Sequence, residues 1–390
     1  MNPHHSPATT SASMLGDDDL ARIREQLPAI HPRAYLNAGT LGPLPQAAID
    51  AIREERAYDA ELRQTIDLWD RLTQRQDDAR SAASELGGVP VEHVALMHST
   101  HEGLNTALWG LDLQAGDHVV TTDEEHPGLL VPLRNLRARV GIEVDVAPWV
   151  DADGFVDSVL AAVTERTRAV AISHVSWATG RFAPLGALRE ALPADVRLVV
   201  DGAQSAGIVP IDPSDGWDAY TISGQKWPCG PNGSGALLLR DPEAWQPTFG
   251  AYMQVTDHES ILDSDVVTTG RRFEQSQESL VPLAGFAAAV RWLLDEVGVE
   301  RAAAHARALN ARARAGLEGA GIDPARLHGD AHLLTLDTPD HDANEVSATL
   351  YHDGVLIRPL GENRIRASFG CWNTPDEVDR LVAALAAALG

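Results

Sequence analysis

The chain has 390 residues, of which 44% are hydrophobic and 22% charged, and its formal net charge at pH 7 is −25. This length predicts two domains, or one large domain with a smaller one, and the composition is ordinary for a soluble globular protein. The acidic excess argues against nucleic acid or an anionic membrane surface as a partner.

The first residues, 1–19, are rich in Ser, Thr, His and Asp and lack the apolar run of a secretory signal peptide. We expect a disordered N-terminal arm over residues 1–19 and a cytoplasmic protein. No stretch is apolar for long enough to span a bilayer. The two cysteines, Cys229 and Cys371, cannot build a disulfide framework or a cysteine-based metal site, and no metal is expected.

The first third of the chain is predicted to be mainly helical. A helix is expected over residues 20–27, where Asp17, Asp18 and Asp19 favour the positive end of its dipole. A short strand near residue 35 then leads into a Gly/Pro loop. Residues 47–86 form a charged helical stretch that is expected to break between 67 and 71.

The middle of the chain alternates between short apolar runs and amphipathic stretches. The apolar runs, rich in Val, Ile or Ala, cover residues 94–98, 118–122, 143–147, 169–174, 197–201 and, further on, 236–239. The amphipathic stretches between them cover residues 102–111, 130–140, 156–164 and 185–192. Strands that alternate with helices predict an α/β fold with a mostly parallel sheet covered on both faces.

The C-terminal part has a pattern of its own. A long helix is predicted over 281–319, followed by strands at 333–336, 356–358 and 364–369 and by helices at 343–352 and 375–389. These units predict a smaller α/β domain. We therefore expect an N-terminal segment, 20–35, packed on the small domain, a large domain over 36–279, and the small domain over 280–390.

Lys226 is the only lysine in a chain with 31 Lys and Arg residues. An amine can lose its proton and attack a carbonyl, whereas a guanidinium cannot. A lysine that forms a Schiff base, with an aldehyde cofactor or a carbonyl substrate, is the leading explanation. The alternative is an exposed lysine that persists by chance in an arginine-biased chain.

Several further candidates follow predicted strands, where parallel sheets bind ligands. The segment 98–103 opens a helix and offers N–H groups and hydroxyls to a phosphate, or is an ordinary helix cap. His126 is suited to stack on an aromatic ligand, or is a loop histidine. Asp201 ends a hydrophobic strand, where it would keep a heteroaromatic nitrogen protonated or cap a helix.

The remaining candidates lie around Lys226 and near the C-terminus. The glycines that follow Ser223, at positions 224, 230, 233 and 235, permit close approach of the backbone to a ligand. Arg358 and Arg366 lie on two successive predicted strands. Either guanidinium would suit a substrate carboxylate, or either is one surface arginine among many.

In chain order, these features resemble the class V aminotransferase family of fold type I pyridoxal-phosphate enzymes, which includes cysteine desulfurases, cystine C–S lyases and isopenicillin N epimerase-like proteins. The resemblance runs from about Tyr35 to the C-terminus and is carried by Asp201-Gly202-Ala203-Gln204 and Ser223-Gly224-Gln225-Lys226. It implies a large domain with a mostly parallel, seven-stranded type of sheet and a smaller C-terminal α/β domain. It also implies pyridoxal 5'-phosphate as cofactor, an amino-acid substrate, and a homodimer with a shared active site.

The resemblance also assigns roles to individual residues. Lys226 would form the Schiff base and move protons, Asp201 would pair with the pyridine nitrogen, and His126 would stack on the ring. Gln204 would reach the ring hydroxyl. The phosphate would be held by Thr100, His101, Ser223 and Gln225, with Ser276 or Gln277 arriving from a second subunit. The substrate would be held by Arg366, which matches the family's carboxylate-binding arginine, and by Arg358, Trp177 and Asn37.

The branch of the family is indicated by cysteines and by the lysine loop. Cysteine desulfurases carry a nucleophilic cysteine on the loop before the final arginine strand, but residues 359–363 here contain none. Cys371 lies beyond that strand, and Cys229 is expected to be a small packed residue. Residues 226–233, in contrast, resemble the Lys-Trp-x-Cys-Gly-Pro-x-Gly stretch of cystine C–S lyases. Trp177 replaces the asparagine that many members place near the cofactor hydroxyl, and it is suited to shape an apolar pocket.

Our hypothesis is β-elimination from L-cystine or a cysteine S-conjugate, which gives pyruvate, ammonia and a thiol or persulfide. Epimerisation, transamination, and decarboxylating or oxidative deamination of an amino acid begin from the same α-carbanion and stay open as alternatives. Cysteine desulfuration is disfavoured. A binding or regulatory role without catalysis would be favoured by loss of Lys226 or Asp201, and both residues are present.

Overall fold

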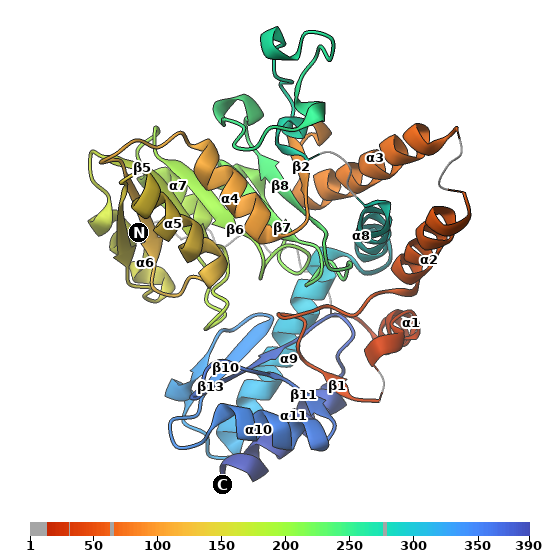
Figure 1. Cartoon of the computed structure of the whole chain (residues 1–390). Coiled ribbons are helices and arrows are strands. Elements are labelled where there is room, and N and C mark those ends of the chain that lie inside the picture. Colours follow the sequence, from red (N-terminus) through yellow and green to blue (C-terminus); the bar gives the residue numbers. More distant parts are fainter. Residues whose placement is uncertain (1–13, 31, 63–65, 276–278) are drawn as a thin grey trace.

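The computed structural model describes residues 14–30, 32–62, 66–275 and 279–390, and in that part of the chain it contains a large and a smaller sheet (Figure 1). The large sheet has seven strands in the order β2-β8-β7-β6-β5-β3-β4. Their bounds are Val94–Met97 (β2), His118–Thr122 (β3), Glu143–Ala147 (β4), Thr167–Ser173 (β5), Arg197–Asp201 (β6), Ala219–Ser223 (β7) and Gly235–Leu239 (β8). All neighbours pair in parallel except β8, which is antiparallel to both β2 and β7. The predicted α/β fold with a mostly parallel sheet is confirmed.

Successive residues of the large sheet face two separate cores. Val119 and Ala169 belong to the core beneath α4 (Thr100–Gly110) and α5 (Pro127–Arg139). Val120 and Val170 belong to the opposite core, which is covered by α3 (Leu68–Gly87), α6 (Ala152–Ala162) and α7 (Leu185–Ala191). Because both faces are buried there, the inner strands β5 to β8 are largely apolar, whereas the edge strand β4 is mostly exposed and alternates Glu143 and Asp145 with valines.

The smaller sheet lies in the C-terminal part of the chain (Figure 1). Its order is β12-β13-β10-β9, all antiparallel, with bounds Leu327–His328 (β9), Leu333–Asp337 (β10), Arg358–Pro359 (β12) and Arg364–Ser368 (β13). Helices α9 (Val299–Gly319), α10 (Ala343–His352) and α11 (Pro375–Leu389) accompany it. A short parallel pair joins β1 (Ala34–Tyr35) to β11 (Val355–Leu356), so the N-terminal segment lies against this part. The domain boundaries at residues 36 and 280 stay a prediction.

The N-terminal helix begins earlier than expected. Helix α1 covers Asp17–Glu25, so residues 17–19, expected to belong to the disordered arm, form its first turn. Three carboxylates stabilise the positive end of the helix dipole, and Asp19 forms an ion pair with Arg301 of α9. Leu15 is also buried. The rest of the expected arm, residues 1–13, lies outside the described residues.

Three further differences concern the predicted elements. The helix expected over 281–319 is divided into α8 (Leu280–Trp292), a π-helical turn and α9, and it turns at Gly298, whose φ is +81°. Helix α8 packs against α2 (Gln46–Glu61) and α3, whereas α9 packs against α11. Strands β7 and β9 were not predicted. The last residues of β7, up to Ser223, were assigned to the motif around Lys226 and therefore not to a strand.

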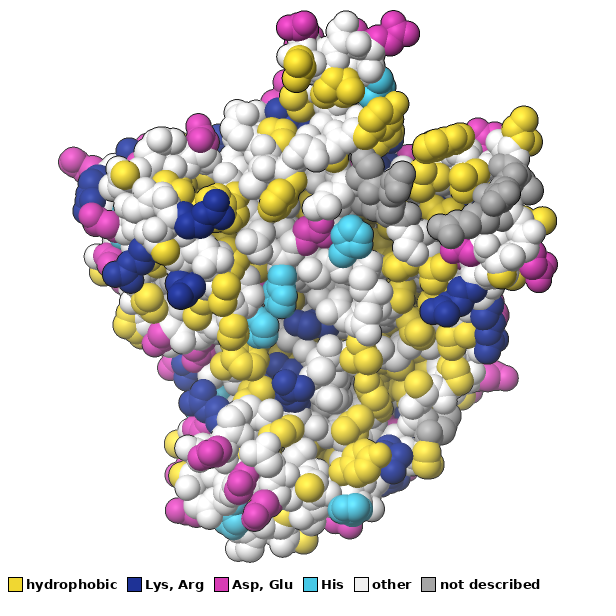
Figure 2. Space-filling view, in the orientation of Figure 1, with side chains coloured by type: hydrophobic (Ala, Val, Ile, Leu, Met, Phe, Trp, Pro, Cys, Tyr) yellow, Lys and Arg dark blue, Asp and Glu magenta, His cyan; other side chains and the backbone are white. Residues whose placement is uncertain are grey.

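The strand directions place the candidate residues together. The carboxyl ends of β2, β3, β5, β6 and β7 share one edge of the large sheet, since these strands run the same way. Figure 2 shows histidine and basic side chains gathered in the hollow between the upper and lower parts of the molecule. Among the described residues, no helix is long and apolar enough to cross a membrane.

Candidate active site

Lys226 lies directly after β7, in a loop closed by the hydrogen bonds from Cys229 N–H to the Lys226 carbonyl (3.0 Å) and from Gly230 N–H to the Gly224 carbonyl (2.8 Å). The segment that follows β1 packs onto this loop, where Gly42 donates its N–H to the carbonyl oxygen of Gln225 (2.8 Å). A Cβ atom at Gly42 would lie 2.0 Å from the Lys226 carbonyl oxygen, so only glycine fits there. The lysine loop is therefore fixed from two sides.

The amine of Lys226 is adapted to proton transfer. Burial lowers its pKa to about 8, with Arg366 and Arg358 acting in the same direction and Asp201 opposing them. A lysine with this pKa has a substantial neutral fraction near neutral pH and is therefore a base and a nucleophile there.

Asp201 is the last residue of β6, and its carboxyl group is buried. Burial raises its pKa, while the charges of Lys226 and His101 act against that rise. Among the described residues, its carboxylate accepts a hydrogen bond only from Ala203 N–H (2.9 Å). The second carboxylate oxygen is thus available to a positively charged ring nitrogen, as a pyridine cofactor requires.

Gln204 is held at both ends of its amide. It donates to the Gly39 carbonyl (2.8 Å) and accepts from the indole N–H of Trp227 (3.1 Å). One amide N–H remains for a ligand. Its predicted contact with a ring hydroxyl is compatible with this arrangement and stays a prediction.

The predicted phosphate residues meet where α4 begins and β7 ends. Ser99 caps α4 by accepting from Glu102 N–H (3.2 Å), and Ser223 donates to the side-chain oxygen of Gln225 (3.0 Å). The hydroxyl of Thr100 is buried and has no partner among the described residues. A buried hydroxyl without a partner is costly, and a helix N-terminus favours an anion, so this corner fits a phosphate group. Ser276 and Gln277 lie outside the described residues.

His126 caps α5 and accepts the N–H of Gly128 on its Nδ1 (3.0 Å). Its ring lies parallel to that of His101, with 5.5 Å between the centroids, and meets the Trp177 ring edge-on at 5.0 Å. Burial lowers the pKa of His126 to about 4, and the charge of Lys226 adds to this effect. The imidazole is therefore neutral at physiological pH and suited to stacking.

The two candidate substrate arginines are cross-strand partners. Arg358 on β12 pairs with Arg366 on β13. Arg366 is only 2% exposed, donates to the Trp177 carbonyl (2.7 Å), and has a buried Nε without a partner. Burial lowers its pKa to about 9, and Arg358 adds to the shift. Neither arginine has a carboxylate partner in the described part of the chain, so the pair is available to an anionic ligand.

Asn37 lies beside this pair. It forms a bridge with Ser368, two residues after Arg366, and its side-chain oxygen accepts the hydroxyl of Thr40 (2.8 Å). Nearby, Gly39 leaves room for the guanidinium, because a Cβ there would lie 2.6 Å from Nη2 of Arg366. The structure thus gathers the candidates from both sheets, and it places Asn37 at the edge of the arginine side.

Two buried residues that contact the candidate site residues or their neighbours were not identified from the sequence. Glu125 accepts hydrogen bonds from Thr122 (2.6 Å) and from the N–H of Ser173 (2.9 Å), and burial raises its pKa to about 7. His332 bonds to the Gln204 carbonyl (2.7 Å), and its ring meets that of Trp227 edge-on at 4.7 Å. Glu125 could have been identified from the sequence, because it directly precedes the candidate His126. No sequence signal identified His332, because only the folded chain brings it next to Gln204.

Neither cysteine resembles an exposed nucleophile. Cys229 is 1% exposed and Cys371 is 3% exposed. Burial raises the pKa of the Cys229 thiol well above its ordinary value and that of Cys371 to about 12. Cys229 packs in the lysine loop, as expected, with its sulfur 3.5 Å from the Trp227 carbonyl oxygen.

Comparison with known proteins agrees with this geometry. The Aminotransferase class-V family matches residues 34–381. A curated relative, "Probable cysteine desulfurase 2" of Mycobacterium leprae, is 30% identical over 411 residues, covering 95% of this chain and 97% of the relative. The cysteine desulfurase of Haloferax volcanii is 31% identical over 390 residues, covering 92% and 89%.

Solved structures show the same similarity. A complex of the cystine C–S lyase C-DES with its product cysteine persulfide has a TM-score of 0.83 and 26% identity, covering 93% of this chain and 99% of that one. The cysteine desulfurase CsdA from Escherichia coli also has a TM-score of 0.83 and 26% identity, covering 97% and 99%. In a C-DES variant with matching similarity, glycine is covalently linked to the pyridoxal-phosphate cofactor. The chain therefore belongs to the class V aminotransferase family of fold type I enzymes, and its cofactor is pyridoxal phosphate.

Proposed function

We propose that this enzyme is a carbon–sulfur lyase that eliminates a thiol or persulfide from the β-carbon of a cysteine derivative. The observation that carries the proposal is that the site contains a basic lysine, while the described residues offer no exposed cysteine that could act as a nucleophile. Lys226 has a pKa lowered to about 8, both cysteines are buried, and the turn between β12 and β13 contains no cysteine. A desulfurase that stores sulfur on itself needs such a thiol, whereas an elimination does not.

The bound cofactor supplies an electron sink for the charge that develops at the substrate α-carbon. Lys226 acts as the base that removes the α-proton, because burial favours the neutral form of its amine and lowers its pKa to about 8. Arg366 orients the substrate through its carboxylate, so that the α-hydrogen faces Lys226. His126 offers a neutral ring that is suited to stack on the cofactor.

The leaving group is stable as a sulfur anion. The bond between the β-carbon and sulfur breaks, and the electron pair leaves with sulfur as a thiolate or persulfide anion. The remaining aminoacrylate takes up water and yields pyruvate and ammonia. A stable sulfur anion needs no attack by the enzyme, which fits the absence of a cysteine from residues 359–363.

The arginine pair supports a substrate with a second negative charge. Arg366 is buried and suits the α-carboxylate, whereas Arg358 is exposed and lies on the neighbouring strand. L-cystine, or a cysteine S-conjugate that carries an acidic group, offers a second carboxylate beyond the sulfur. Such substrates are therefore proposed ahead of simple S-alkyl cysteines.

The decisive experiment is to measure pyruvate release by the cofactor-loaded protein from L-cystine and several S-substituted cysteines, with Lys226→Ala as the blank. We expect pyruvate in step with free thiol or persulfide. A persulfide that accumulates on the protein would instead establish desulfuration, the activity in the names of the curated relatives. Deuterium uptake at the α-carbon from heavy water without pyruvate would replace elimination by epimerisation or transamination.

A further inference from the structure

The loop after β5 lies between the cofactor side and the substrate side of the site. This loop, residues 175–182 and hereafter the Trp177 loop, is closed by an antiparallel bridge between Val175 and Phe182. The N–H of Ser176 donates to the carbonyl of Arg181 (2.9 Å), and the N–H of Gly180 donates to the carbonyl of Ser176 (2.9 Å). These contacts connect the two ends of the loop, so Trp177 is linked to Thr179 and Arg181 through the loop itself.

Trp177 contacts one residue on each side of the site. Its carbonyl oxygen accepts a hydrogen bond from Nη1 of Arg366 (2.7 Å), and its ring meets His126 edge-on. No other hydrogen bond to the Arg366 guanidinium is formed by the described residues, and its Nε is buried without a partner. The position of the Trp177 carbonyl therefore determines how the guanidinium is presented to a carboxylate.

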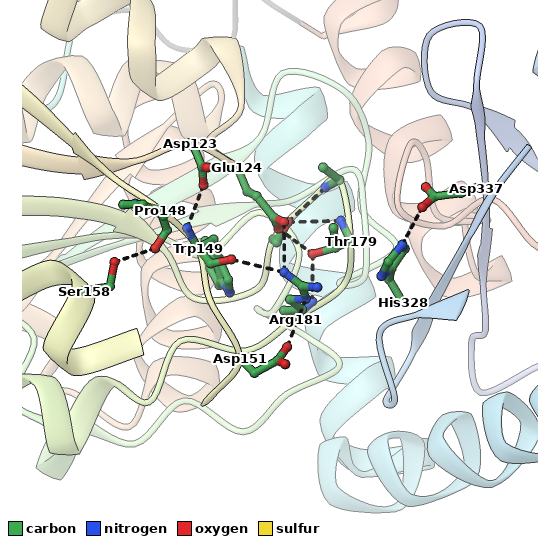
Figure 3. Close-up of polar contacts among 12 residues, drawn as sticks. Asp123, Glu124, Pro148, Trp149, Asp151, Ser158, Thr179, Arg181, His328 and Asp337 are labelled. Atoms are coloured by element: carbon green, nitrogen blue, oxygen red, sulfur yellow. Dashed lines mark hydrogen bonds and ion pairs between the residues drawn. The ribbon is translucent and has the colours of Figure 1, made fainter. Parts of the chain in front are cut away.

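Glu124 anchors the Trp177 loop from the loop after β3 (Figure 3). Its Oε2 accepts the hydroxyl of Thr179, and its Oε1 lies 3.5 Å from Nη1 of Arg181. The Glu124 side chain is only 16% exposed, so its contacts are shielded from water. Glu124 lies two residues before His126, and it therefore ties the stacking histidine and the Trp177 loop to one support.

The far side of this anchor is held by the segment after β4. Arg181 donates to the carbonyl of Trp149 (3.1 Å), and Trp149 donates its N–H to Asp123 (2.7 Å) (Figure 3). Asp151 also lies 3.8 Å from the Arg181 guanidinium, but its side chain is 92% exposed. Asp151 thus offers Arg181 a solvent-screened charge, whereas Glu124 offers a shielded one.

On its other side the Trp177 loop is in close contact with the smaller sheet. A Cβ atom at Gly180 would lie 2.8 Å from the Cβ of Leu333 in β10, and Gly180 has a φ of +76°. A Cβ at Gly329 would lie 2.6 Å from the Thr179 carbonyl oxygen. The loop therefore fills the space between Glu124 and β10, and little freedom is left for it while the anchor is intact.

We propose that Glu124 and Thr179 are positioning residues for substrate recognition. They hold the Trp177 loop so that the Trp177 carbonyl aims the Arg366 guanidinium at the substrate carboxylate. The proposal rests on the proposed function only in taking Arg366 as the carboxylate site. It adds two residues that touch neither substrate nor cofactor and act through the loop.

The test is equilibrium binding of L-alanine and L-alaninamide to the cofactor-loaded protein, followed by the absorbance of the cofactor. The two probes differ in the carboxylate, and neither has a β-substituent to eliminate. For Thr179→Val and Glu124→Gln we expect the dissociation constant of L-alanine to rise about tenfold, because the charge-assisted hydrogen bonds between Arg366 and the carboxylate are weakened. Binding of L-alaninamide should stay within about twofold of the wild type.

Two matched variants control the experiment. Thr179→Ser keeps the hydroxyl and should restore wild-type binding, and Asp151→Asn removes only the exposed partner of Arg181 and should change neither probe. Equal weakening of both probes, or unchanged binding of L-alanine, would overturn the proposal. Failure of pyruvate release in the substrate assay would reject the lyase function and leave this comparison intact, because alanine binding needs no elimination.

Discussion

The two sheets contribute different kinds of groups to one site. The large sheet supplies Asp201, the last residue of β6, and Lys226, which follows the carboxyl end of β7. The smaller sheet supplies Arg358 and Arg366, which face one another across an antiparallel pair. In the large sheet a carboxylate, Asp201, lies near the amine of Lys226, whereas in the smaller sheet two guanidinium groups are neighbours. We therefore expect the large sheet to serve proton transfer and the smaller sheet to bind an anionic group of the substrate.

The largest expected effect concerns the proton-transfer side. Lys226 in the cofactor-free protein should react with an amine-selective reagent with a midpoint near pH 8, because burial lowers its pKa to about 8 from the ordinary 10.5. Since Lys226 is the only lysine, peptide mass mapping separates its reaction from that of the N-terminal amine. Asp201→Asn should lower the midpoint further, because Asp201 raises this pKa. A midpoint above pH 10 would show that the amine is not desolvated.

A second prediction concerns the buried acid next to His126. The folded-state pKa of Glu125 is raised from 4.5 to about 7, chiefly by burial and slightly by Asp201, against the hydrogen bonds from Ser173 and Thr122. The native state therefore holds this proton more tightly than the unfolded chain. Its contribution to stability is complete below pH 4.5 and is lost as the pH rises through about 7.

This loss amounts to roughly 3 to 4 kcal/mol, because the shift of the pKa from 4.5 to about 7 contributes about 1.4 kcal/mol per unit. Glu125→Gln cannot titrate, so its free energy of unfolding in urea should fall less than that of the wild type between pH 5 and pH 8. Glu92→Gln, at an exposed site, controls for the change in net charge. Parallel pH profiles for wild type and Glu125→Gln would contradict the prediction.

The contrast between the sheets also explains how much the sequence could predict. Asp201 ends a strand that the sequence predicts, and Lys226 is the only lysine of the chain, so both residues could be located from the sequence although β7, the strand before Lys226, was not predicted. Arg358 and Arg366 could be placed on two successive strands, but their pairing depends on the register of β12 and β13, which no local pattern encodes. Glu124 and Thr179 are 55 residues apart in sequence and meet only through the order of β3 and β5. The composition favours a helix throughout residues 281–319, so the sequence predicts one helix there and does not reveal the turn at Gly298.

On the substrate side, Arg366→Gln should raise KM for every cysteine substrate about a hundredfold while changing kcat less, because a buried charged hydrogen-bond donor is lost. Arg366→Lys keeps the charge and loses the planar fork that bonds both the Trp177 carbonyl and a carboxylate. We therefore expect the lysine variant to recover only part of the affinity. Steady-state kinetics with L-cystine and an S-alkyl cysteine would measure this, and a pure loss of kcat in both variants would assign Arg366 to catalysis instead.

The smallest effect should separate the two arginines. Arg358 is exposed, so it can contribute only a screened interaction, and Arg358→Gln should raise KM at most about fivefold for a substrate with a second carboxylate. An S-alkyl cysteine offers Arg358 no partner, and its KM should stay within about twofold. Added salt should mimic the substitution for the dicarboxylic substrate alone, since screening acts on exposed charges more than on buried ones. If both substrates instead lose affinity equally, Arg358 acts by supporting Arg366, and the two guanidiniums form one carboxylate site rather than two.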